Sequence, residues 1–152
     1  RDTPGRAVIQ TYTPDNYVIG LAAKQDYESF YGIEIAARKM MKYPPYTDLC
    51  MFGFVGAVGT EEEAVRQAAG RFLRLLQAAA TTEYRDVPMI VLDPSPASVT
   101  RVAGKIRYKL LVKTVNNARM RKMTAGLLES FSRASENRAV SVYVDINPAA
   151  ML

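Results

Sequence analysis

The hydrophobic and polar positions of the chain alternate most regularly from Lys105 to Lys113, in the sequence Lys-Ile-Arg-Tyr-Lys-Leu-Leu-Val-Lys. Successive side chains of a β-strand point to opposite faces of a sheet, so a period of two predicts a strand. Basic residues occupy odd-numbered positions of this strand, namely Lys105, Arg107, Lys109 and Lys113. Apolar residues occupy the even-numbered positions Ile106, Tyr108, Leu110 and Val112. We therefore expect one face to enter a core and the other to present only positive charge.

The pattern on either side of this segment predicts three further strands and two helices. The predicted elements are a strand at 48–58, a helix at 60–80, a strand at 87–92, the basic strand at 105–114, a helix at 117–131 and a strand at 139–146. This order is that of the ferredoxin-like split β-α-β-β-α-β fold, an α+β architecture with both helices on one face of an antiparallel sheet. The other face should be open, and parity places the cations there together with Ser141 and Tyr143.

The first 46 residues follow a different pattern. Residues 1–13 contain one short segment, 6–12, that reads as a lone strand, which suggests that it belongs to the sheet of a preceding domain. Residues 14–46 have apolar side chains at helical spacing in two pieces, and we expect their aromatic side chains to pack in a core. The segment Tyr43-Pro-Pro-Tyr46 ends the helical region because proline cannot continue a helix. Residues 47–152 then form the α+β domain.

Charge is distributed unevenly along the chain, which has a formal net charge of +5. Between Asp93 and Glu129 there is no acidic residue, whereas eight lysines and arginines occur there. A strand face of a single sign needs either a polyanionic partner or an acidic neighbouring surface. The pattern therefore favours an anionic partner without identifying it.

Cysteine and histidine usage excludes several classes of site. The chain has one cysteine, Cys50, and no histidine, so intrachain disulfides, Cys/His zinc sites and His-dependent catalytic triads are excluded. Cys50 lies in an apolar segment, where we expect an inert buried thiol. There is no phosphate-binding glycine loop and no nucleophile-elbow motif, so we expect no catalytic residue. The longest apolar run, 49–59, is too short to span a bilayer, and a reducing cytoplasm is the expected location.

Several segments, taken in order, resemble the PriA family of bacterial replication-restart helicases, also called primosomal protein N′. They are Pro-Gly-Arg-Ala-Val-Ile-Gln-Thr-Tyr at 4–12, Ala-Lys-Gln-Asp-Tyr-Glu-Ser-Phe-Tyr at 23–31, the Tyr-Pro-Pro-Tyr turn at 43–46, Asp-Pro-Ser-Pro-Ala at 93–97, the basic strand from Gly104, and Val-Asp-Ile-Asn-Pro at 144–148. Each segment alone is a weak signal. Their shared order over essentially the whole chain is specific.

The resemblance implies that the chain is a C-terminal piece of such a helicase. Residues 1–13 would be the last strand of the second helicase lobe, 14–46 a helical connector, and 47–152 a C-terminal DNA-binding domain similar in fold to a ribosomal small-subunit protein. The parent would couple ATP hydrolysis to 3′→5′ unwinding in the bacterial cytoplasm, at forks on the nucleoid. The resemblance places its ATP and Mg²⁺ site and its zinc-binding cysteines outside this chain, so no cofactor is expected here.

The resemblance also implies partners, namely single-stranded and forked DNA, other primosome proteins, and the acidic, Phe-terminated tail of single-stranded DNA-binding protein. No membrane partner is expected. For DNA, we expect phosphate contacts and one base-stacking platform from Arg101, Lys105, Arg107, Lys109, Lys113 and Tyr143. For the acidic tail, we expect contacts from Asn117, Arg119, Arg121 and Lys122.

Two hypotheses for the basic strand remain open at this point. It binds DNA phosphates, or it docks the acidic protein tail, and charge alone cannot separate two anionic ligands. RNA binding by a ribosomal-type domain is a weaker third hypothesis, because it rests on fold analogy only. A solvated edge, or a face docked on acidic parts of the parent protein, would also explain the stripe.

Overall fold

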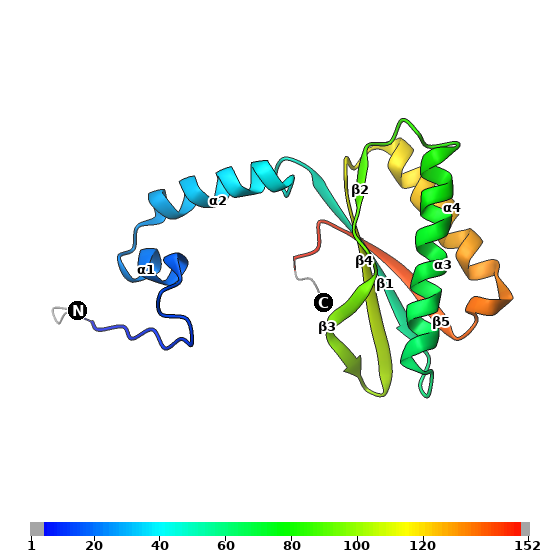
Figure 1. The fold of residues 1–152 in the computed structure, drawn as a ribbon, viewed down its shortest axis with the longest axis horizontal. Coiled ribbons are helices and arrows are strands. Elements are labelled where there is room, and N and C mark those ends of the chain that lie inside the picture. Colours follow the sequence, from blue (N-terminus) through cyan, green and yellow to red (C-terminus); the bar gives the residue numbers. More distant parts are fainter. Residues whose placement is uncertain (1–4, 150–152) are drawn as a thin grey trace. The chain divides into compact units, whose positions relative to one another are not determined.

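The structure, a computed structural model, describes residues 5–149 and divides the chain into two compact units, Arg1–Met41 and Lys42–Leu152 (Figure 1). The first unit contains the helices α1 (Tyr17–Ala23) and α2 (Tyr27–Met41). The second unit contains β1 (Asp48–Gly56), α3 (Glu62–Thr81), β2 (Met89–Val91), β3 (Ser95–Val102), β4 (Lys105–Thr114), α4 (Ala118–Arg133), the 3-10 helix η1 (Ser135–Asn137) and β5 (Val140–Ile146). The boundary between the units falls after Met41, slightly before the predicted boundary at 46.

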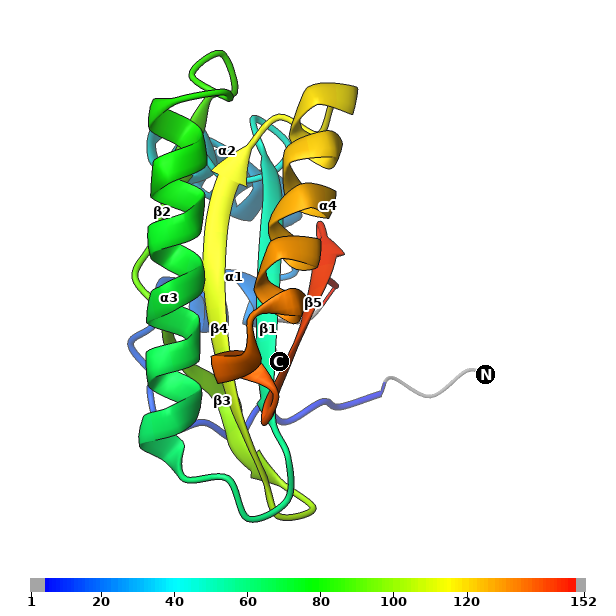
Figure 2. The same cartoon turned by 90° about the vertical axis from the view of Figure 1, so that its right-hand side faces the viewer.

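The sheet of the second unit has the strand order β2-β4-β1-β5, and β3 also pairs with β4. All of these pairs are antiparallel. Strands β2 and β3 lie along the same edge of β4 and together act as one interrupted edge strand. With that strand counted once, the order is that of the ferredoxin-like fold, and both α3 and α4 lie on the same side of the sheet (Figure 2). The predicted α+β fold class is confirmed.

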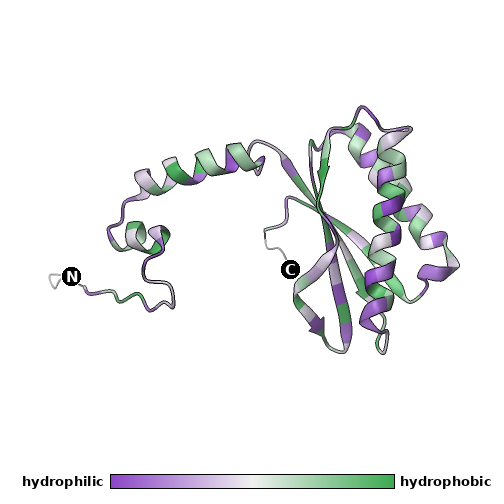
Figure 3. Ribbon diagram, in the orientation of Figure 1, coloured by the Kyte–Doolittle hydropathy of each residue, from purple (hydrophilic) through white to green (hydrophobic). Residues whose placement is uncertain are grey.

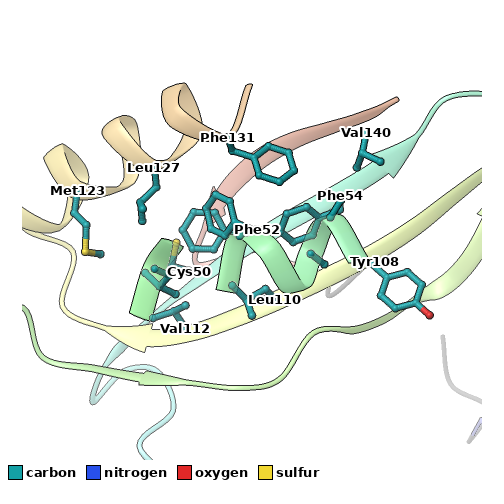
Figure 4. Close-up of a cluster of buried hydrophobic side chains, with 14 of the residues drawn as sticks. Cys50, Phe52, Phe54, Tyr108, Leu110, Val112, Met123, Leu127, Phe131 and Val140 are labelled. Atoms are coloured by element: carbon teal, nitrogen blue, oxygen red, sulfur yellow. The ribbon is translucent and has the colours of Figure 1, made fainter. Parts of the chain in front are cut away.

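The core lies between these two helices and one face of the sheet. Its centre is a cluster of four phenylalanines, in which Phe52 and Phe72 have ring centroids 4.6 Å apart and Phe54 and Phe131 5.9 Å apart (Figure 4). Helices α3 and α4 each carry hydrophobic and hydrophilic residues, as expected of helices that bury one face only (Figure 3). Tyr108 belongs to this core, as its parity predicts, and its hydroxyl donates to Glu62 Oε1 at 2.8 Å.

Strand β3 is absent from the sequence-based prediction, which ended the preceding strand at the Asp-Pro-Ser-Pro segment. Proline lacks a backbone donor, but an edge strand tolerates it because one side of the strand needs no ladder partner. Pro96 accordingly lies opposite Tyr108 on the outer strand β3. The turn to β4 consists of Ala103 and Gly104, which both have positive φ angles, 48° and 75°, as a tight two-residue hairpin requires.

The first unit confirms one prediction, leaves one untested and corrects one. The helical region forms in two pieces, as predicted. Residues 6–12 form no strand, because a strand needs a ladder partner and the described residues provide none. The prediction placed that partner in a preceding domain, and it stays a prediction. The expected packing of aromatic side chains in a core is wrong within the part of the chain that the structure describes. Neither α1 nor α2 contains a buried residue, because two short helices cannot cover each other's apolar faces.

Candidate nucleic-acid interface

The sheet face opposite the helices carries the cations at the first half of β4. Ile106, Tyr108, Leu110 and Val112 are buried in the core. This confirms the prediction that the even-numbered residues of β4 face the core. The odd-numbered residues of β4 therefore point to the other face of the sheet. We call the group formed there by Lys105, Arg107, Lys109 and Tyr143 the basic face.

The register of the ladders places Tyr143 in one row with Lys109. Gly53 on β1 is the partner of Lys109 on one side and of Tyr143 on the other. A Cβ atom built on Gly53 would overlap the ring of Tyr143, so the ring lies across the glycine and toward β4. Tyr143 remains 38% exposed. A missing side chain on the central strand therefore lets an aromatic ring lie flat beside a row of cations.

The cations of the basic face are available to a ligand. The side chains of Lys105 and Arg107 form no hydrogen bond or ion pair with any residue that the structure describes, and Lys109 Nζ makes only a long contact of 3.4 Å with Ser98 Oγ. Elsewhere, arginines such as Arg66 and Arg133 pair with carboxylates on their own helices, at 2.7 Å and 2.6 Å. The basic face therefore concentrates charge that the domain itself does not neutralise.

The same sheet face is not open along its whole length, which corrects the prediction. Leu49 and Met51 point to it but are only 5% and 1% exposed. Lys113, the partner of Leu49, has its Nζ atom 3.7 Å from the ring centroid of Tyr43, a cation–π geometry. Asp145, the partner of Met51 on β5, adds an acidic group to this end. Lys113 thus points to the predicted face but is engaged with an aromatic ring.

Arg101 lies outside the basic face. Its ladder partner on β4 is Ile106, whose side chain is buried under the helices, and directly opposed residues of an antiparallel pair point to the same side. The reason is an irregularity between Pro96 and Arg101, which adds residues to β3 and changes its register. The positions of these residues in the sequence alone could not predict this change in the register of β3.

The residues predicted to dock an acidic tail have diverse roles in the structure. Asn117 caps α4, because its Oδ1 atom accepts from the backbone N–H of Met120 at 2.9 Å. Arg119 pairs with the carboxylate of Asp86 at 3.2 Å and lies over the ring of Tyr84. Two residues of the set, Arg121 and Lys122, are exposed, and Arg121 Nη1 donates to Asn116 Oδ1 at 2.9 Å.

Arg121 also borders a hollow between α4 and the edge strand β5. This hollow, which we call the α4–β5 groove, has a volume of about 250 Å³ and is lined by Met120, Arg121, Thr124, Ala125, Leu128, Val144 and Ile146. Apart from Arg121 and the threonine, the lining is apolar. The core-facing side chains of β5 contribute to it, so it lies on the helix side of the sheet. The predicted cations therefore fall on two separate surfaces.

Cys50 and the acidic groups are the other chemically relevant side chains of the described residues. Cys50 is buried, as predicted. Burial, with a smaller effect of the Asp145 charge, raises the pKa of Cys50 to about 12, as expected of an inert thiol. Among residues 5–149, no three His, Cys, Asp or Glu side chains gather as a metal site would require. No helix within the same range is long and apolar enough to cross a membrane.

Comparison with known proteins places the chain among replication proteins. The family model described as "Primosomal protein N C-terminal domain" matches residues 39–149. The replication restart protein PriA of Bacillus subtilis is 30% identical over 99% of this chain, and that of Chlamydia muridarum is 34% identical over 95%. The chain spans 18% of the length of each of these two relatives. Among solved structures, a dimeric ferredoxin-like protein from an uncultured marine organism has a TM-score of 0.35 at 10% identity, with 66% of this chain and 92% of that chain covered.

Proposed function

Because the chain belongs to the primosomal protein N C-terminal domain family, we propose that it is the non-catalytic DNA-binding region of a replication-restart helicase. The relatives named above are replication restart proteins, and the matched region is a C-terminal domain. The observation that carries the proposal is the basic face, in which unpartnered cations and an exposed aromatic ring share one side of the sheet. Open sheets that combine these two features suit single-stranded nucleic acid.

The proposed mechanism assigns backbone phosphates to the cations and a base to the ring. Lys105, Arg107 and Lys109 alternate along β4, so their Cα atoms repeat about every 6.8 Å, and an extended strand of DNA can present successive phosphates to them. Arg107 can bind a phosphate with two parallel hydrogen bonds, whereas the lysines act as point charges. The exposed part of the Tyr143 ring can stack on an unpaired base.

A charge-reversal experiment tests this function. We expect the double variant Lys105→Glu with Arg107→Glu to weaken binding of single-stranded and forked DNA, measured by fluorescence anisotropy over a series of salt concentrations. Each lost phosphate contact should reduce the slope of log affinity against log salt by about 0.7 to 0.9. The control, Arg74→Glu with Arg85→Glu, makes the same change of charge on α3 and on the loop that follows it.

Unchanged DNA affinity of the Lys105/Arg107 variant at low salt would refute the assignment. A parallel titration with single-stranded RNA of the same sequence tests the third hypothesis, because a clear preference for RNA would favour it.

The α4–β5 groove supports a second candidate function, the docking of the acidic, Phe-terminated tail of single-stranded DNA-binding protein. Its apolar lining suits an aromatic end group, while Arg121 at its border and the exposed Lys122 suit carboxylates. Arg121→Glu should then weaken binding of an acidic Phe-terminated peptide and leave oligonucleotide binding unchanged. The opposite result, a peptide that responds only to Lys105→Glu with Arg107→Glu, would place the tail on the basic face.

The proposal also covers the activities of the replication-restart helicase as a whole. In this proposal, ATP-driven 3′→5′ unwinding and the nucleotide and zinc sites belong to parts outside these residues, in a protein acting at bacterial forks, and other primosome proteins remain proposed partners. A full-length protein that carries Lys105→Glu with Arg107→Glu should retain DNA-independent ATP binding but lose fork-stimulated hydrolysis at low DNA concentration.

A further inference from the structure

A second hollow lies at the end of the sheet where β4 begins, next to the basic face. It has a volume of about 250 Å³ and is lined by Val55, Gly56, Ala57, Lys105, Arg138, Ala139 and Ser141. Three strand ends meet there, since β1 ends where β4 and β5 begin. The sequence pattern singled out neither the hollow nor Arg138.

The sheet ladders hold this hollow in place. Val55 is the partner of both Arg107 on β4 and Ser141 on β5. One step beyond the end of β1, the backbone N–H of Ala57 donates to the carbonyl of Ala139 at 2.8 Å. The hollow is therefore bounded by ordered backbone, with Lys105 entering from one side and Arg138 from the other.

Arg138 has no partner within the part of the chain that the structure describes. Only its backbone N–H is engaged, donating to the carbonyl of Ser135 at 3.3 Å. The nearby Arg71, by contrast, is held by Asn137 at 2.8 Å and by Glu136 at 3.4 Å. The acidic group closest to Arg138 along the chain is thus already paired, and two cations face the hollow without a counter-charge.

The size and lining of the hollow suit a small anion. Apart from Val55 and the two cations, the lining consists of glycine, alanine and serine residues, whose small side chains leave room for a ligand. A water molecule occupies about 30 Å³ of liquid, so the hollow has room for a phosphate group and several waters. The Ser141 hydroxyl makes only a 3.3 Å contact with the Val55 carbonyl, and it can turn to donate to a phosphate oxygen.

We propose that Lys105, Arg138 and Ser141 form a binding site for one backbone phosphate of single-stranded DNA. This inference rests on the proposed function, because it extends the basic face across β1 to β5. The DNA path then crosses the sheet at this end instead of following β4 alone. Arg138 supplies the planar donor pair that a phosphate accepts best.

The test compares three variants of the whole 152-residue chain on a short fluorescein-labelled oligothymidylate. Arg138→Ala should weaken binding and reduce the salt slope by about 0.7, whereas Arg138→Lys, which keeps the charge, should restore most of the slope. Arg74→Ala is the matched control, since Arg74 is an exposed arginine of α3 without a partner among residues 5–149. It should change neither quantity. Urea unfolding of each variant verifies that the fold is retained.

Inorganic phosphate provides a second readout that identifies the chemical group. At equal ionic strength, phosphate should displace the oligonucleotide from the native chain more strongly than chloride does, and Arg138→Ala should abolish the difference. Equal competition by both salts would overturn the phosphate site.

The two proposals fail in different ways. If Arg138→Ala behaves like Arg74→Ala while Lys105→Glu with Arg107→Glu abolishes binding, the phosphate site is wrong and the DNA-binding face stands. If no variant alters binding, the proposed function fails and the phosphate site fails with it.

Discussion

The ring of Tyr143 lies across Gly53, in the space that a side chain of residue 53 would occupy. The two residues are ladder partners on β5 and β1, and Lys109 is the partner of Gly53 on its other side. Because Gly53 has no side chain, the Tyr143 ring can lie on the sheet next to Lys109. This arrangement joins the stacking surface to the phosphate-binding side chains.

Gly53→Ala should destabilise the domain by about 1–3 kcal/mol, because the new Cβ atom overlaps the Tyr143 ring and forces it off the sheet. Urea unfolding measures the change. In a Tyr143→Ala background the same substitution should cost much less, because the overlapping ring is gone. Gly126→Ala on α4 is the control, since no atom lies near its added Cβ, and it should stabilise the domain by about 0.5–1 kcal/mol. Equal losses from Gly53→Ala in both backgrounds would contradict the packing described here.

Tyr143→Ala should weaken binding of single-stranded DNA by about 1–3 kcal/mol, the usual loss of one base stack. Tyr143→Phe should bind like the native chain, because the ring and not the hydroxyl provides the stacking surface. Titration of a fluorescent oligonucleotide measures both. Tyr31→Ala, which removes an exposed tyrosine of α2 outside the domain, is the control. A loss for Tyr143→Phe as large as that for Tyr143→Ala would rule out stacking.

The Asp48 carboxylate should stabilise the folded domain only at pH values above the acid range. Hydrogen bonds from the Asn147 side chain and from the Asn116 backbone lower the pKa of Asp48 below its ordinary value of 3.8. A lowered pKa in the folded state means that the stabilisation is present above the unfolded pKa and is lost as the pH falls through the folded one. Asp48→Asn should therefore be less stable than the native chain at neutral pH, with a difference that shrinks below about pH 4.

The measurement is the free energy of unfolding in urea across this pH range. Asp93→Asn provides the control, because Asp93 is exposed and its carboxylate accepts no hydrogen bond within residues 5–149. A difference between Asp48→Asn and the native chain that stays constant with pH would show that the carboxylate charge is irrelevant.

Cys50 should be unreactive toward thiol reagents in the folded chain. Its thiol is fully buried, and burial raises its pKa to about 12, so almost no thiolate forms near neutral pH. Ellman's reagent should label the native chain only at the rate at which the domain unfolds, and label it at once in denaturant. Glutathione in the same buffer is the reference thiol. Rapid labelling without denaturant would place Cys50 at the surface.

The local pattern of hydrophobic and polar residues determined much of this fold. The period of two in β4 assigned Tyr108 and Leu110 to the core and Lys105, Arg107 and Lys109 to the opposite face, because side-chain direction in a strand depends only on position. The order of strands and helices determined the fold class in the same way. The cap of α4 by Asn117 is also a local property, since the side chain bonds to a backbone N–H three residues away.

The tertiary structure decided which of the predicted cations share a surface. Arg101 lies on the other side of the sheet because of the irregularity in β3, Lys113 is engaged by Tyr43, and Arg119 is engaged by Asp86. Arg138 joins Lys105 although the two are far apart in sequence, and Gly53 makes room for Tyr143. Each of these relationships depends on strand order and register, which place distant segments side by side. The sequence by itself therefore determined the side-chain directions of the regular strand β4, whereas only the assembled sheet decided the direction of Arg101 on β3 and the neighbours of each side chain.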